Sequence, residues 1–298
     1  MALVVKNSTL GDITVKEAMR RQTLSLFLDS SIQSAIKYLL KHKVSALLVT
    51  DLTGKPVGVV SKTDIVSAFY AGLPVDMSLE SIMVGPPLFC RQDDSLEAAL
   101  EKMRSNRVYR LYVIDQSDEN VIGALAYPDV VALLYVYCRG CEQSAVNRRK
   151  SHLDDSAVLR FRVRDVMTPK VVSYRKSDSL AEIIEGMSQN RFSAVVVNDD
   201  NLQPVGVISK TDLMLAYNHG VSTEAQASQI LTSPHVRSCD ENEFIEDAIR
   251  EMVFSELHRL FVHDDSPHNI TGVLSLSDVA RFRSGSCHAC VGARITLK

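Results

Sequence analysis

Four stretches of the chain share one order of apolar and polar positions. Each stretch opens with a short helical turn that contains Met or Leu, followed by a short apolar segment and an amphipathic helix. Residues 31–42 show the helical spacing of apolar side chains, with Ile32, Ala35, Ile36, Leu39 and Leu40 on one face. The predicted opening turns are Val15–Met19, Leu79–Met83, Val163–Met167 and Gln229–Leu231. The corresponding later helices are predicted to start near Leu96, Leu180 and Phe244.

Two apolar strands and a final helix complete each stretch. The first strands include 46–49 and 194–197, and the second are 57–60, 121–125, 205–208 and 270–274. The final helices begin near Asp64, Asp129, Asp212 and Asp278. Apolar strands joined to helices predict α/β (α+β) units of the βαββα type. Because a unit of about 60 residues has a small core, we expect the units to pair sheet to sheet.

The chain is an internal duplication. Residues 56–72 and 204–220 are identical at 10 of 17 positions, at an offset of 148. We therefore predict two pseudo-symmetric modules. The first spans 1–138, with repeats at about 12–72 and 76–138, and the second spans 161–298, with repeats at about 161–220 and 224–285 and then a tail with two cysteines. Residues 139–160, with the basic run Asn147–Lys150, are predicted to be a linker.

Composition narrows the functional classes. The 298 residues carry 33 basic and 36 acidic side chains, which argues against a general nucleic-acid binder. The most apolar run, Val130–Cys138, is too short to span a bilayer, and the first 12 residues do not resemble a signal peptide. The expected compartment is the cytosol, where thiols stay reduced, with no role for nucleic acid or membrane.

Three stretches carry one polar motif before the final helix. Residues 58–64 read GVVSKTD, 206–212 read GVISKTD and 272–278 read GVLSLSD. Ser-x-x-Asp at this place is typical of a helix N-cap. The same hydroxyls, carboxylate and helix N–H groups also suit a ribose and a phosphate. Both roles fit one geometry, so the sequence leaves both open.

The four stretches together resemble cystathionine-β-synthase (CBS) domains, and a pair of them resembles a Bateman module. The layout of four repeats is also similar to the family of regulatory γ subunits of AMP-activated protein kinase. The fourth repeat carries this likeness most strongly, with His258-Arg259-Leu260 and Ser275-Leu276-Ser277-Asp278. The resemblance implies a non-catalytic regulatory protein whose ligand is AMP, ADP, ATP or S-adenosylmethionine. It also implies either a homodimer or a regulated partner protein.

The resemblance implies three ligand sites, each built from two paired repeats. The motif Asp would hold the ribose, and an apolar segment of the paired repeat would contact the adenine. The first site would use Ser61, Thr63, Asp64, Leu88, Phe89 and Arg110. The second would use Ser209, Thr211, Asp212, His235, Val236, His258 and Arg259. The third would use Ser275, Ser277, Asp278, Thr168, Val171, Val172, Ser193 and Ala194.

The second repeat departs from the motif, because residues 123–129 read GALAYPD. Ala126 lacks the hydroxyl and Pro128 lacks a backbone donor, so we do not expect a ligand there. The arginines and lysines near the motifs leave alternatives open. Arg110 and Arg259 would face phosphates or lie at a surface edge, and the lysines within the SKTD sequences, Lys62 and Lys210, would reach phosphates or face solvent.

The six cysteines form three duplicated pairs at an offset of 149. Cys138-x-x-Cys141 and Cys287-x-x-Cys290 could together form a Cys₄ metal site or act as redox thiols, or be inherited helix-end thiols without a function. Cys90 and Cys239 are predicted to pack as small hydrophobic residues. The alternative to a nucleotide sensor is therefore a metal- or thiol-redox sensor on the same scaffold. An enzyme is disfavoured, because no P-loop, GxGxxG or nucleophile–base constellation stands out.

Overall fold

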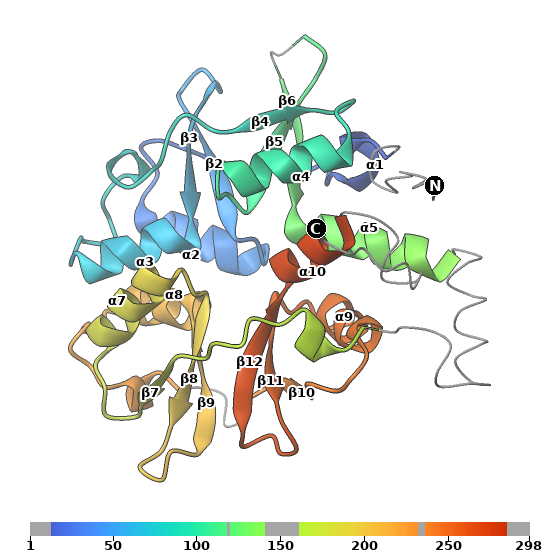
Figure 1. The fold of residues 1–298 in the computed structure, drawn as a ribbon. Coiled ribbons are helices and arrows are strands. Elements are labelled where there is room, and N and C mark those ends of the chain that lie inside the picture. Colours follow the sequence, from blue (N-terminus) through green and yellow to red (C-terminus); the bar gives the residue numbers. More distant parts are fainter. Residues whose placement is uncertain (1–12, 118–119, 141–160, 232–235, 285–298) are drawn as a thin grey trace, which may run out of the picture. The chain divides into compact units, whose positions relative to one another are not determined.

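Four copies of a β-α-β-β-α unit make up the computed structural model, which describes residues 13–117, 120–140, 161–231 and 236–284 (Figure 1). The first two repeats contain α1 Val15–Ala18, β1 Ser25–Phe27, α2 Ile32–Lys41, β2 Ala46–Thr50, β3 Pro56–Ser61 and α3 Lys62–Tyr70, then η1 Leu79–Ser81, β4 Phe89–Arg91, α4 Leu96–Ser105, β5 Arg110–Ile114, β6 Val121–Ala126 and α5 Tyr127–Gly140. The predicted α/β class and the four repeats are confirmed.

The third and fourth repeats follow the same order. They contain η2 Val163–Asp165, β7 Ser173–Arg175, α7 Leu180–Asn190, β8 Ala194–Asn198, β9 Pro204–Ser209 and α8 Lys210–Asn218, then η3 Ala227–Gln229, β10 Ser238–Asp240, α9 Ile245–Phe254, β11 Arg259–His263, β12 Ile270–Ser275 and α10 Leu276–Ser284. The fourth opening turn is the 3₁₀ helix η3, two residues earlier than the predicted Gln229–Leu231. No helix in the described part of the chain is long and apolar enough to cross a membrane.

Each repeat forms one three-stranded mixed sheet. The first strand runs parallel to the second, which pairs antiparallel with the third, as in the order β1-β2-β3. The middle strands are the most apolar; in β2 all five residues from Ala46 to Thr50 are buried. Because successive side chains of a strand point to opposite faces of the sheet, both faces of β2 are covered, which suits a continuous apolar run.

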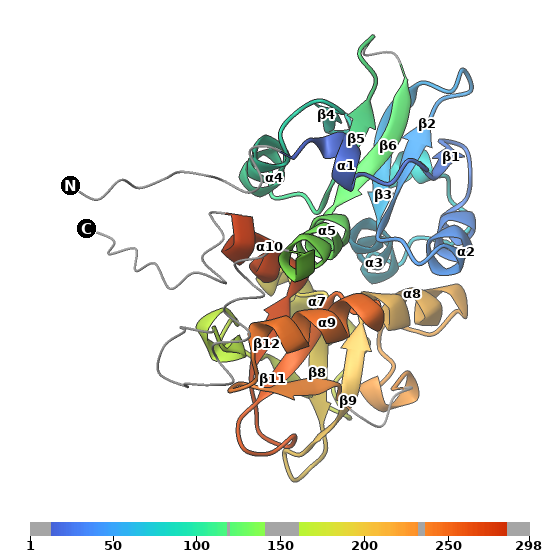
Figure 2. The ribbon, with the colours of Figure 1, turned by 90° about the vertical axis from the view of Figure 1, so that its right-hand side faces the viewer.

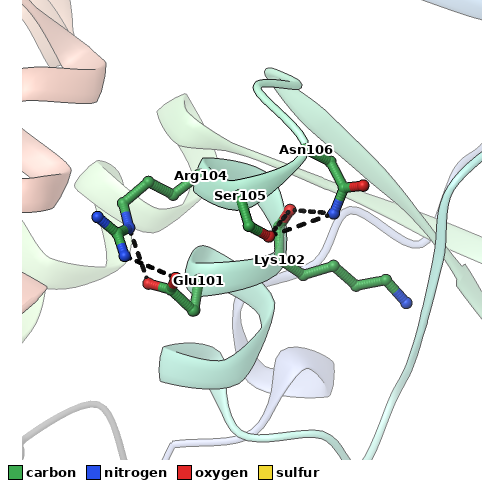
Figure 3. Close-up of polar contacts among 5 residues, drawn as sticks. All are labelled: Glu101, Lys102, Arg104, Ser105 and Asn106. Atoms are coloured by element: carbon green, nitrogen blue, oxygen red, sulfur yellow. Dashed lines mark hydrogen bonds and ion pairs between the residues drawn. The ribbon is translucent and has the colours of Figure 1, made fainter.

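Serine side chains begin the amphipathic helices of the first three repeats. Oγ of Ser31, Ser95 and Ser179 accepts a hydrogen bond from the amide three residues later, at 3.1, 3.1 and 3.2 Å. Figure 3 shows the other end of α4, where the Asn106 amide group donates to the Lys102 carbonyl at 2.9 Å. These polar contacts satisfy backbone groups that a helix leaves without partners at its ends.

The described chain divides into two compact units. Among the described residues, unit 1 comprises 13–22, 88–117, 120–140, 161–170 and 238–284, and holds the sheets of repeats 2 and 4; unit 2 comprises 23–87, 171–231 and 236–237, and holds those of repeats 1 and 3. Each unit has its own apolar core. In unit 1, α5 packs on α10 and α9, and in unit 2, α3 packs on α8. The predicted modules each contribute to both units, so their sheet-to-sheet pairing stays a prediction.

The opening turns pack on a neighbouring repeat rather than on their own. In unit 1, α1 lies against repeat 2, where the Val15 amide donates to the Asp94 carbonyl at 2.9 Å. In unit 2, η1 lies against repeat 1, where the Leu79 amide donates to the Ser30 carbonyl at 2.8 Å. Repeats 3 and 4 exchange η2 and η3 in the same way, through Val163 and Ala227. Each unit therefore contains the opening turns of repeats whose sheets belong to the other unit.

The motif glycines make room for these opening turns. A Cβ added to Gly58 would lie 2.6 Å from Sδ of Met83, and one added to Gly272 would lie 2.5 Å from Sδ of Met167. A Cβ added to Gly123 would lie 2.5 Å from the Arg20 carbonyl oxygen. The methionine of each of these two turns thus packs directly on the motif glycine, where a larger residue would clash with it.

Candidate functional site

The motif of repeat 1 forms at the junction of β3 and α3. Ser61 ends the strand and caps the helix, since its Oγ accepts from the amides of Thr63 at 3.2 Å and Asp64 at 3.4 Å. In return, Oδ2 of Asp64 accepts from the Ser61 amide and from the Ser61 hydroxyl, both at 2.7 Å. This reciprocal capping box confirms that the motif caps the helix.

Repeats 3 and 4 build the same box. Oδ2 of Asp212 accepts from the Ser209 amide at 2.8 Å and from the Ser209 hydroxyl at 2.6 Å. Oδ2 of Asp278 accepts from the Ser275 amide at 3.1 Å and from the Ser275 hydroxyl at 2.5 Å. The Ser277 hydroxyl also lies 2.8 Å from that of Ser275. One local geometry therefore recurs at three of the four helix starts.

The capping box uses only one oxygen of each motif carboxylate. Within the described chain, Oδ1 of Asp64 and Oδ1 of Asp212 accept no hydrogen bond. Both carboxylates are partly buried. An oxygen held in a fixed direction by its neighbour is preorganised to accept from a ligand hydroxyl. Capping a helix and holding a ligand are therefore compatible roles for one side chain.

Two lysines cross between the motifs of unit 2. The Lys62 ammonium donates to Oγ1 of Thr211 at 2.8 Å, and the Lys210 ammonium donates to Oγ1 of Thr63 at 2.7 Å. Burial lowers the pKa of Lys62, and the charge of Asp212 opposes this effect. The lysines thus do not simply face solvent, and a contact with a ligand phosphate stays a prediction. Each places a positive charge beside the motif of the other repeat.

The two predicted arginines begin corresponding strands of unit 1. Arg110 is the first residue of β5, opposite Ala126, and Arg259 is the first residue of β11, opposite Ser275. Ala46 and Ala194 hold this register position in repeats 1 and 3, opposite Ser61 and Ser209. Burial lowers the pKa of Arg259, and the charge of Asp278 opposes this effect. A partly buried arginine thus lies beside the fourth motif rather than at an open surface edge.

An aromatic contact joins the residues that precede these arginines. The rings of Tyr109 and His258 have centroids 5.9 Å apart, and Tyr127 meets Tyr109 edge to face at 5.2 Å. Burial raises the pKa of Tyr109 above its ordinary value. The second and fourth repeats therefore bring Tyr109, His258 and their neighbouring arginines to one region of unit 1.

Repeat 2 keeps the motif carboxylate, Asp129, but both of its oxygens accept hydrogen bonds from other groups of the chain. Oδ2 of Asp129 accepts from the Ala126 amide at 2.9 Å, in the place of the capping box. Oδ1 of Asp129 accepts from Nε of Arg20, which follows the opening helix α1. The sequence prediction identified the missing hydroxyl of Ala126 but not Arg20. A comparison of Arg20 with Thr168, which follows the corresponding turn of repeat 3, could have revealed the exception.

The members of each predicted ligand site are divided between the units. Ser61, Thr63, Asp64, Ser209, Thr211, Asp212, Val171, Val172, Ser193, Ala194 and Val236 belong to unit 2; Leu88, Phe89, Arg110, Thr168, His258, Arg259, Ser275, Ser277 and Asp278 belong to unit 1. His235 lies outside the described residues. Within unit 1, Thr168 pairs with Val273 of β12, two residues from Ser275. The assembly of the three complete sites stays a prediction.

Of the six cysteines, the structure describes the side chains of Cys90 and Cys239. Cys90 and Cys239 are buried and unpaired, and burial raises the pKa of each thiol to about 12. Their packing as small hydrophobic residues is confirmed. The side chains of Cys138, Cys141, Cys287 and Cys290 lie outside the described part of the structure. Among the residues that are described, no group of three or more His, Cys, Asp or Glu side chains could hold a metal ion.

A groove of about 610 Å³ lies elsewhere in unit 2, after helices α3 and α8. It is lined by the loops Gly72–Val75 and Gly220–Thr223 and by the stacked rings of Phe69 and Tyr217, whose centroids are 5.1 Å apart. None of the residues predicted to bind a ligand lines this groove. It therefore has no place in the motif-based site.

Known structures and proteins share this architecture. Protein MJ1225 of Methanocaldococcus jannaschii, described as a candidate archaeal homologue of the γ subunit of AMP-activated protein kinase, is 18% identical and covers 91% of this chain and 99% of its own, with a TM-score of 0.73. An uncharacterised conserved protein of Pyrococcus horikoshii is 15% identical and covers 91% of this chain and 100% of its own, with a TM-score of 0.58. At these identities the likeness shows the fold.

Sequence comparison gives the same result at the level of the family. The γ-3 subunit of human AMP-activated protein kinase is 26% identical over 194 residues, which cover 63% of this chain and only 38% of that subunit. The CBS domain model matches residues 15–71, 79–135, 163–219 and 227–285. With four matches over most of its length, the chain belongs to the CBS domain family and is a distant homologue of the γ subunits of AMP-activated protein kinase.

Proposed function

We propose that this chain is a non-catalytic regulatory protein that binds adenosine-containing ligands with Asp64, Asp212 and Asp278. One observation carries the proposal: Asp64 and Asp212 hold their helices with Oδ2, while Oδ1 accepts no hydrogen bond within the described chain. A fixed carboxylate oxygen can accept from the vicinal hydroxyls of a ribose. The membership of the CBS family supports an adenosine compound as the source of that ribose.

The crossing lysines favour a phosphorylated ligand at the motifs of repeats 1 and 3. Lys62 and Lys210 place ammonium groups on Thr211 and Thr63, beside the N-termini of α8 and α3. Ammonium groups and helix N-termini both attract anions. AMP, ADP and ATP therefore fit these two motifs better than S-adenosylmethionine, whose sulfonium is cationic.

The proposed output is a change in the arrangement of the repeats. A ligand changes an arrangement only if it binds two arrangements with different affinity. The change would be read by a regulated partner protein or a second copy of the chain. The similarity to a kinase subunit supports a partner protein, as the name of that relative indicates.

Calorimetric titration with AMP, ADP, ATP and S-adenosylmethionine tests the proposal. Wild-type protein should bind at least one of them at two or three sites. Asp64→Asn keeps an oxygen for the capping box but replaces Oδ1 by an amide donor, so we expect one site to weaken about tenfold or more, the effect of about 1.4 kcal/mol. Asp129→Asn is the matched control, because Arg20 already holds its Oδ1, and it should leave ligand binding unchanged.

Lys62→Met tests the phosphate contribution in the same titration. Methionine keeps most of the length of lysine but removes the charge beside Thr211. Binding of AMP or ATP at the third-repeat motif should weaken, while binding of adenosine should not. Wild-type protein that binds none of the ligands, or an Asp64→Asn variant with unchanged binding, would contradict the proposed function.

A further inference from the structure

Arg20 ties the first opening turn to the motif of repeat 2. Its amide donates to the Ala124 carbonyl and its carbonyl accepts from the Ala124 amide, each at 2.9 Å. The side chain then reaches Asp129, where Nε donates to Oδ1. All three residues belong to unit 1, and Figure 2 shows α1, which precedes Arg20, beside β6. The backbone of Arg20 is thus fixed by its pairing with Ala124, and its guanidinium is fixed by Asp129.

Arg20 donates to Oδ1 of Asp129, the carboxylate oxygen that corresponds to the one that does not cap the helix at Asp64. At Asp129, Oδ2 accepts from the Ala126 amide, as Oδ2 of Asp64 does from the Ser61 amide. The remaining oxygen of Asp64 accepts no hydrogen bond within the described chain, whereas that of Asp129 accepts from Nε of Arg20. Arg20 therefore stands where a ligand hydroxyl would donate.

The corresponding positions in two other repeats are uncharged. Val84, after η1, pairs with Val59 of β3, through hydrogen bonds of 2.8 and 2.9 Å. Thr168, after η2, pairs with Val273 of β12 through bonds of 2.9 and 3.0 Å. The backbone contact is thus common to the three, and only the side chain at Arg20 carries a group that can neutralise the motif carboxylate.

Burial explains why the contact persists. The side chain of Asp129 is 7% exposed, whereas that of Arg20 is 61% exposed. An enclosed carboxylate without a cation is costly, so removal of the partner is unfavourable. A ribose hydroxyl could also donate to Oδ1, but it carries no charge, so it would leave the charge of the enclosed carboxylate without a counterion. A neutral sugar is therefore a poor competitor for this oxygen.

We infer that Arg20 is a built-in occupant that closes the motif of repeat 2 to adenosine ligands, so that the chain fills at most three of its four motifs. This inference rests on the proposed function of the other motifs. It makes Arg20, in the opening turn of repeat 1, the residue that sets the number of sites. The residue touches no reacting group, and its effect is on binding alone.

Stoichiometry tests this inference. The double variant Arg20→Thr/Ala126→Ser places a threonine at position 20, as at the corresponding Thr168, and a serine hydroxyl at position 126, as at the corresponding Ser61. The single variant Ala126→Ser is its matched control. Titration with AMP and ATP should show one more site in the double variant than in wild type, and no added site in Ala126→Ser. Thermal melting of each variant confirms that it is folded before the sites are counted.

Several outcomes would overturn the inference. An added site in Ala126→Ser alone would mean that the missing hydroxyl, not Arg20, closes the motif. An unchanged count in the folded double variant would mean that Arg20 is a structural ion pair only. Should the double variant not fold, four filled sites in wild-type protein would by themselves overturn the inference, and three or fewer would support it. No binding by wild-type protein would instead reject the proposed function, and the inference with it.

Discussion

At the residue scale, one carboxylate combines two roles that are usually considered separately. Asp64 fixes the start of α3 through Oδ2 and presents Oδ1 in a direction set by that fixation. The same division occurs at Asp212. Substitution by alanine would remove both roles at once, and a loss of binding would then be hard to distinguish from a frayed helix. The asparagine variant separates the two.

The buried thiols give the folded state a pH dependence. Burial raises the pKa of Cys90 and Cys239 from 9.0 to about 12, so between these values the unfolded chain loses thiol protons that the folded chain keeps. The contribution of the two thiols to the free energy of unfolding is therefore fully present below pH 9. It falls as pH rises toward 12, by up to about 1.4 kcal/mol per pH unit and thiol. We expect Cys90→Ala/Cys239→Ala to show a clearly shallower fall.

Guanidinium denaturation under reducing conditions at pH 8 and pH 10.5 measures this effect. The single variant Cys90→Ala is the internal control and should lie midway between wild type and the double variant. Parallel losses of stability in wild type and double variant would show that other groups cause the alkaline fall.

At the scale of the element, the four amphipathic helices end in one unusual conformation. The first or second residue after each helix has a positive φ: Lys43 at 52°, Arg107 at 55°, Arg191 at 56° and Glu256 at 54°. Glycine is the residue that adopts this conformation without steric cost, yet none of the four is glycine. The recurrence shows that the fold, rather than the identity of the residue, imposes this end.

Arg107→Gly should therefore stabilise the protein. The substitution relieves the left-handed strain of an exposed residue, which is worth about 1 kcal/mol. Lys102→Gly is the matched control inside α4, where glycine should cost about 1 kcal/mol. Thermal unfolding of both variants checks the pair, and a melting temperature that falls in both would contradict the explanation.

At the scale of the whole molecule, the exchanged opening turns make each repeat depend on another. Val15 is fully buried among residues of repeat 2, and Leu79 is fully buried among residues of repeat 1. A boundary drawn at the end of a sequence repeat therefore separates a turn from the core that it completes. The family matches at 15–71 and 79–135 follow the sequence and do not reflect this exchange.

Two variants test the exchange reciprocally. Val15→Ala leaves a cavity in the core of unit 1 and should reduce hydrogen-exchange protection in α4 and β6 of repeat 2. Leu79→Ala should reduce protection in α2 and β3 of repeat 1. Mass spectrometry of peptic fragments measures both. Loss of protection in β2 and β3 after Val15→Ala would mean that the turn supports its own repeat instead.

The sequence by itself determined what local patterns encode. Apolar spacing identified the helices at Ile32 and Leu96, the apolar runs identified the second and third strands, and Ser-x-x-Asp identified the helix caps. Each of these depends on neighbours within a few residues. The duplication likewise showed that Arg110 and Arg259 hold equivalent places, as the strand register confirms.

Only the tertiary structure decided the contacts between distant segments. Nothing near Lys62 in sequence indicates Thr211 as its partner, and nothing near Arg20 indicates Asp129, 109 residues later. Such pairs arise when packed cores bring two helices or strands together, because long side chains then contact whatever the partner element presents. A repeat pattern encodes each element, but the exchange of opening turns and the occupied motif follow from how the elements pack.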